Sequence, residues 1–192
     1  MRRIWSLRIV RLMFVGLGTL AVADPADIIP GAERSAHLTT MKTRVEEPAT
    51  VTPMTIAEVF ALPRPPRAYT QSQFEEMSAL ERRGVSVVGY VARVDPQHDG
   101  DFHIQITAEP PGSCLHHNTA DQFVTELTPQ FQARWPTSTL ATLRALCGTG
   151  TQVRISGWLL YDAPHDRDRH RATGWEVHPV TRIEVCCWRE LQ

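Results

Sequence analysis

The spacing of apolar residues changes at Gly84, from short helix-like stretches before it to strand-like alternation after it. Residues 85–91 and 153–159 share one pattern, in which β-branched residues alternate with others and a Gly, an aromatic and an aliphatic residue follow. A Gly inside a strand marks a bulge or sharp bend, which a small barrel needs in order to close. We therefore expect both segments to be strands of one barrel.

Three further segments have the pattern of strands. Apolar and polar residues alternate over residues 102–106, a second run covers residues 122–127, and the last covers residues 175–187. Pro179 interrupts the last segment and is expected at an edge or a bulge, because Pro cannot donate a ladder hydrogen bond. Residues 95–100 have the composition of a hairpin turn.

A helix is predicted between the third and fourth strands. Thr137 or Ser138 is its expected N-cap, the leucines up to Leu146 form its apolar side, and Gly148 follows its end. The order β-β-β-α-β-β is that of the OB-fold, a five-stranded Greek-key barrel. The sequence thus predicts a mostly β protein with short helices, in which residues 84–192 form a small OB-like barrel. Another small β-barrel or an open α+β sheet is the alternative.

The segment before the barrel divides into two parts. Residues 24–53 are polar, contain Pro and show no period, so we expect a flexible arm. Residues 54–83 are expected to form a short helical extension, because a Thr is followed three residues later by Glu or Gln at two helix starts. The two pairs are Thr55 with Glu58 and Thr70 with Gln73.

The N-terminus has the features of a signal peptide. Four arginines lie within the first eleven residues, residues 12–23 are uncharged and apolar, and Ala21-Val22-Ala23 matches the small residues before a cleavage site. The apolar run is short for a membrane span. We expect residues 1–23 to be removed, leaving a periplasmic or secreted protein without a stable membrane span.

An oxidising compartment makes the cysteines candidates for disulfide bonds. The four residues are Cys114, Cys147, Cys186 and Cys187. Four cysteines allow three pairings, and the spacing does not select one. Cys114 and Cys147 are each favoured as a partner for a C-terminal cysteine or for each other. The absence of a CxxC pair argues against a structural zinc site.

Charge argues against a nucleic-acid partner. The chain has a formal net charge of −1, and residues 84–192 hold nine Arg against twelve Asp or Glu. A groove that follows a phosphate backbone needs the opposite balance. The loop at residues 166–171 alternates basic and acidic residues, which predicts a solvated segment whose charges compensate one another.

Acidic and histidine residues recur on the polar sides of several predicted strands. The candidate binding residues are Asp101, His103, Glu126, Tyr161, Asp162, His165, Glu176 and His178. If these faces converge, they offer ligands for a divalent metal ion or groups for acid–base chemistry. The candidate metal ligands are Asp162, His165, Glu176 and His178. The competing interpretation is a wet barrel face with structural hydrogen bonds.

Several of these residues carry a resemblance to a group of exported bacterial proteins that have no assigned reaction. It rests on Asp99-Gly-Asp101-x-His103, on Glu126, on Tyr161-Asp162-x-x-His165 and on Trp175-Glu176-x-His178-Pro179-Val180. The last element is the most specific, and the resemblance covers residues 85–185. It implies a small OB-like barrel and draws attention to the matched residues.

Three functions fit these observations. The first is an exported OB-like binding module, with residues 162–174 at the edge of the ligand site and an oligosaccharide or oligonucleotide as its class of ligand. The second is a metal-dependent hydrolase, such as a phosphodiesterase, that uses the Asp, His and Glu set. The third is a structural envelope protein in which the polar residues only form a hydrogen-bond network. We expect the first.

Overall fold

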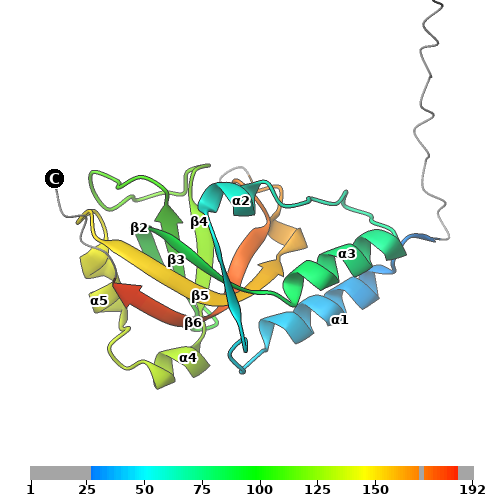
Figure 1. The fold of residues 1–192 in the computed structure, drawn as a ribbon, viewed down its shortest axis with the longest axis horizontal. Coiled ribbons are helices and arrows are strands. Elements are labelled where there is room, and N and C mark those ends of the chain that lie inside the picture. Colours follow the sequence, from blue (N-terminus) through cyan, green and yellow to red (C-terminus); the bar gives the residue numbers. More distant parts are fainter. Residues whose placement is uncertain (1–26, 169–170, 186–192) are drawn as a thin grey trace, which may run out of the picture.

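The computed structural model describes residues 27–168 and 171–185. Within them, β2 (Gly84–Pro96) pairs antiparallel with β3 (Phe102–Thr107), and β3 pairs antiparallel with β4 (Phe123–Leu127). β4 lies parallel to β6 (Trp175–Val185). β5 (Gln152–Tyr161) pairs with both β6 and β2 and so closes the barrel (Figure 1). This is the OB-like barrel that the strand pattern predicts.

The barrel closes around side chains that alternate along each strand. In β3 the inward residues Ile104 and Ile106 are fully buried, and Phe123 and Leu127 play the same role in β4. Trp175 at the start of β6 is also almost completely buried. Because strand residues alternate between two faces, the polar residues between these positions lie on the outside of the barrel.

Pro179 lies at an irregularity of the sheet, as its chemistry predicts. The register between β5 and β6 shifts on both sides of Gly157, opposite the segment that contains Pro179. A Cβ atom on Gly157 would lie 2.2 Å from the carbonyl oxygen of Pro179. The strands approach each other so closely here that only glycine fits.

Substituting Gly157→Ala is therefore expected to lower the free energy of unfolding by about 1–3 kcal/mol, because the backbones of β5 and β6 must separate. Urea unfolding measures the change. Gly112→Ala is the matched control, since a Cβ atom there meets no atom within 4 Å. Equal stability of the two variants would contradict the proposed close contact.

The N-terminal part contains more structure than the sequence predicts. The elements are α1 (Gly31–Lys42), β1 (Val51–Met54), α2 (Ile56–Phe60) and α3 (Gln71–Glu81). Thr55 and Thr70 form the two predicted capping boxes at the starts of α2 and α3. The prediction of a flexible arm over residues 24–53 is wrong for the described part, which holds α1 and β1.

α1 escaped prediction because it has no apolar face. None of its residues is buried, so its sequence lacks the helical period of a packed helix. Polar contacts hold it instead: His37 pairs with Glu81 of α3, and Lys42 pairs with Asp162 after β5. α1 and α3 lie side by side on one flank of the barrel (Figure 1).

The connection between β4 and β5 holds α4 (Pro129–Arg134) and α5 (Leu140–Leu146). The predicted helix corresponds to α5, although its N-cap is Thr139 and not an earlier residue. A disulfide joins Cys114 to Cys147, one of the pairings that the sequence allows.

Several predictions lie outside the described residues. They are the signal peptide over residues 1–23 and the placement of Cys186 and Cys187. Within the described residues, no helix has the length and apolar character needed to cross a membrane.

Candidate functional site

Polar side chains converge on the outer surface of β3, β4 and β6. Four of them alternate with the inward core residues of these strands: His103, Glu126, Glu176 and His178. The end of α1 and the loop between β5 and β6 cover them. Glu126, Glu176 and His178 are accordingly no more than 3% exposed. These four residues, together with Lys42, Asp162 and Arg171, are called the polar cluster below.

Glu126 is the centre of the polar cluster. Its Oε2 lies 2.7 Å from Nδ1 of His178, and its Oε1 lies 2.8 Å from Nε2 of His103. Nη2 of Arg171 lies 3.7 Å from the same Oε1. Burial alone would raise the pKa of Glu126, but the hydrogen bonds from the two histidines lower it well below its usual range. Glu126 is therefore an ionised carboxylate.

His178 has a fixed orientation. Its Nε2 lies 3.1 Å from the backbone carbonyl oxygen of Lys42, which can only accept a hydrogen bond. Nε2 therefore carries a hydrogen, and Nδ1 faces the carboxylate of Glu126. Burial alone would lower the pKa of His178, but the hydrogen bond to Glu126 and the nearby carboxylates raise it. The ring thus links α1 to β4.

Lys42 and Arg171 are the members of the polar cluster that the sequence did not indicate. Nζ of Lys42 lies 2.8 Å from Oδ2 of Asp162 and 3.9 Å from Oε1 of Glu176. Burial alone would lower its pKa, but the carboxylates of Glu176, Asp162 and Glu126 raise it. One signal could have indicated it: Lys42 is the single lysine among 20 basic residues.

Glu176 and Asp162 are almost completely buried. Nη1 of Arg171 lies 3.1 Å from Oε2 of Glu176, and Nδ1 of His165 lies 2.9 Å from Oδ2 of Asp162. Burial raises the pKa of Glu176, and the Glu126 and Asp162 carboxylates add to the effect. Burial would also raise the pKa of Asp162, but Lys42 lowers it. The two carboxylates therefore differ in proton affinity.

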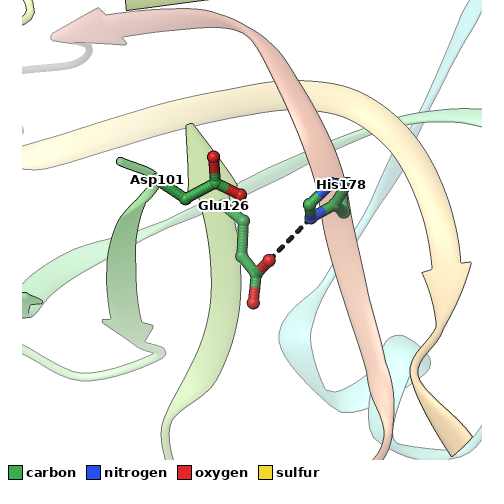
Figure 2. A group of neighbouring side chains, drawn as sticks. All are labelled: Asp101, Glu126 and His178. Carbon is green, nitrogen blue, oxygen red and sulfur yellow. Dashed lines mark hydrogen bonds and ion pairs between the residues drawn. The ribbon is translucent and has the colours of Figure 1, made fainter. Parts of the chain in front are cut away.

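The candidate metal set from the sequence does not converge around an open position. Nζ of Lys42 lies between Asp162 and Glu176, and His165 is an exposed residue that contacts Asp162 from outside. Within the described ranges, a different group brings its ligand atoms within 4.8 Å of one another. It consists of Asp101, Glu126 and His178 (Figure 2).

The prediction of a solvated loop over residues 166–171 is wrong for Asp166 and Arg171, whereas Arg167 and Asp168 are exposed as expected. The Arg171 side chain is 8% exposed, and Asp166 is 3% exposed. Oδ1 of Asp166 accepts hydrogen bonds from Nε of Arg64 and from the backbone N–H of Gly174. Asp166 is thus directed toward the segment before α3, and Arg171 is directed onto the barrel.

A small cleft opens beside the polar cluster. It has a volume of about 250 Å³, and its lining includes Lys42, Arg44, Asp101, Glu126 and His178. Asp101 is 8% exposed, and its carboxylate makes no hydrogen bond or ion pair with any described residue. Burial raises the pKa of Asp101.

A second cavity lies between α1, α3 and the loop that follows β5. Its volume is about 540 Å³. Tyr69, Phe74, Met77 and Tyr161 form its apolar wall. Tyr161 is the one sequence candidate in this lining, and its ring packs 5.2 Å from that of Trp175. We call this space the aromatic cavity.

The lining of the aromatic cavity also contains charged groups. Glu81 at 3% exposure binds Nε2 of His37 and accepts the backbone N–H of Tyr161, so its carboxylate is satisfied. The guanidinium of Arg34 lies 5.0 Å from the ring centre of Tyr69. Arg67 and Arg167 are exposed lining residues that form no ion pair with the described residues.

Comparison with known proteins adds little to this description. No family model and no curated protein sequence matches the chain. Among solved structures, it is similar to a protein described as an aspartyl-tRNA synthetase from Leishmania major Friedlin, with 10% sequence identity and a TM-score of 0.36. The match covers 83% of this chain and 27% of the synthetase chain. A similarity this low carries no argument about function.

The site therefore has two parts with different chemistry. The polar cluster is a closed network of ion pairs that joins α1, the barrel and the β5–β6 loop. The aromatic cavity is open, has walls of aromatic side chains and carries guanidinium groups that have no ion-pair partner among the described residues. Lys42 and Asp162 connect the two parts, because their ion pair joins α1 to the loop after β5, and both of these segments line the cavity.

Proposed function

We propose that the protein is an exported OB-like binding module that holds an acidic oligosaccharide in the aromatic cavity. The observation that carries the proposal is the combination of aromatic walls with three guanidinium groups, those of Arg34, Arg67 and Arg167, that lack an ion-pair partner among the described residues. Aromatic side chains stack on the apolar faces of sugar rings, and arginines bind carboxylates with paired donors. A volume of about 540 Å³ lies in the range of small-ligand sites.

The charge of the cavity favours an anionic ligand. Its two buried carboxylates already have partners, since Glu81 pairs with His37 and Asp166 pairs with Arg64. Arg34, Arg67 and Arg167 then leave the lining with unneutralised positive charge. A uronic-acid residue supplies both a ring for the aromatic wall and a carboxylate for these guanidinium groups.

An oligonucleotide fits the fold class but not the distribution of charge. Nucleic-acid grooves carry basic residues along an extended track, so that several phosphates are neutralised. In this barrel domain the acidic residues outnumber the basic ones. The arginines at the aromatic cavity form one local group, which suits a ligand with one or two negative charges.

The test is isothermal titration calorimetry of the full-length mature protein with uronic-acid trisaccharides, their neutral counterparts and a short oligonucleotide. We expect binding of the acidic trisaccharide and at least roughly tenfold weaker binding after Arg67→Gln combined with Arg167→Gln, because each lost charge-assisted contact costs about 1.5 kcal/mol or more.

Arg182→Gln is the matched control, because Arg182 is an exposed basic residue that does not line the aromatic cavity. It should leave the affinity unchanged. Tighter binding of the oligonucleotide, or an equal loss of affinity in the control variant, would contradict the proposal.

A further inference from the structure

We propose that Asp101, Glu126 and His178 bind one divalent transition-metal cation, with Zn²⁺ as the ion that fits the ligands best. Asp101 lies just before β3, and the other two residues come from β4 and β6. Their side chains point toward one another (Figure 2). None of them lines the aromatic cavity, so this site is independent of the proposed oligosaccharide site.

The distances suit a cation after small side-chain rotations. One ligand atom from each residue lies within 4.8 Å of the others. In a tetrahedral site with Zn–ligand bonds of roughly 2.0–2.2 Å, ligand atoms are roughly 3.4 Å apart. Two carboxylate oxygens and one imidazole nitrogen leave the fourth position for water from the adjoining cleft.

Asp101 is an independent indication of a missing partner. The residue is 8% exposed at the edge of the cleft, and its carboxylate has no hydrogen-bond or ion-pair partner among the described residues. Buried carboxylates are expensive unless they are paired, hydrogen-bonded or bound to a metal. Of these three possibilities, metal binding fits the position of Asp101, because a cation shared with Glu126 and His178 would neutralise its carboxylate.

His178 is oriented as a metal ligand is. Its Nε2 donates to the carbonyl oxygen of Lys42, which fixes the ring and aims Nδ1 at Glu126. Metal-binding histidines usually donate their other N–H to a carbonyl or carboxylate in this way. His103 supports Glu126 from the side away from His178, because it contacts the other carboxylate oxygen.

The balance of permanent charge points in the same direction. The polar cluster and Asp101 together contain four carboxylates, from Asp101, Glu126, Asp162 and Glu176. They contain two side chains that are permanently positive, Lys42 and Arg171. Metal binding at Nδ1 requires His178 to give up the hydrogen that it donates to Glu126. With neutral histidines, the set has two more carboxylates than permanently positive side chains, a difference that suits one divalent cation.

The test is calorimetric titration of chelator-treated mature protein with Zn²⁺ in a buffer that does not bind the ion. We expect one ion per chain and a rise in melting temperature. Asp101→Asn should weaken binding by about 100-fold, because even outer-shell losses cost 10–100-fold. This variant should keep the stability of the metal-free protein, since the Asp101 carboxylate has no partner to lose.

Asp99→Asn is the matched control. Asp99 lines the same cleft and accepts the backbone N–H of Asp101, which an Asn oxygen can also do. It should bind Zn²⁺ as the unaltered protein does. Absence of a stoichiometric ion, or Zn²⁺ binding that Asp101→Asn leaves unchanged, would overturn the metal site. Oligosaccharide affinity measured with and without chelator separates this outcome from failure of the proposed function.

Discussion

Replacing Glu126 with Gln is expected to lower the free energy of unfolding by about 3–5 kcal/mol, the usual cost of removing one partner from a buried ion pair. Gln has nearly the same shape, so the loss comes from charge and hydrogen bonding. The amide leaves Arg171 without one of its two carboxylates and presents His178 and His103 with at most one acceptor. All three contacts converge on this single carboxylate.

Urea unfolding of the two proteins in buffer with a chelator measures this loss without any contribution from a bound cation. Glu184→Gln is the matched control on β6, because its carboxylate is 36% exposed and pairs with exposed arginines. Exposed ion pairs contribute at most about 1 kcal/mol, so the control should change little. Similar losses in both variants would mean that Glu126 is not the centre of the buried network.

The barrel could be predicted because its determinants are local in sequence. Alternation of apolar residues along β3 and the shared Gly pattern of β2 and β5 each lie within one short segment. Thr55 and Thr70 fix two helix starts through side chains only three residues away. Given these elements in order, few arrangements bury every apolar face, and the OB-like barrel is one of them.

The site was harder to predict because its contacts span long sequence separations. The two-residue strand period correctly assigns Glu126, Glu176 and His178 to the polar face, but it does not say which strands are neighbours. His178 meets Glu126 because β6 lies parallel to β4, a pairing that depends on the closed barrel. Asp101 lies just before β3, and it reaches this group because β3 pairs with β4.

The error about the metal ligands has one physical origin. Asp162 and Glu176 do come together, as a metal site would require, but the ammonium of Lys42 lies between them. Lys42 belongs to a helix with no buried residue, so no apolar pattern marks that helix or its position. A contact made by charge between segments 120 residues apart leaves no local signal.

Lys42→Met should therefore lower the free energy of unfolding at neutral pH by about 3 kcal/mol, the lower end of the range for breaking a buried ion pair. The lower end applies because the Lys42 side chain is 32% exposed, whereas Asp162 is 2% exposed. Met retains the length of the side chain. The variant should also exchange the amide hydrogens of α1 faster, since α1 loses its charged contact with the loop.

The effect of Lys42→Met should depend on pH in a defined direction. Lys42 lowers the pKa of Asp162 in the folded protein. Stability from this pair is therefore complete above the pKa of about 3.9 of an unfolded Asp, and it is lost as the pH falls through the lower folded pKa. The difference between the unaltered protein and the variant should be largest near pH 7 and shrink below pH 4.

Urea unfolding at a series of pH values between 7 and 3 tests both statements. Arg182→Met is the matched control, because Arg182 is 57% exposed and its pair with Glu184 lies at the surface. Its effect should stay small at every pH. If Lys42→Met changes the free energy of unfolding as little as this control does, the charge of Lys42 does not hold α1 in place. If its loss is large but does not shrink in acid, the lysine acts by packing, and Asp162 is not the partner that gives the pair its strength.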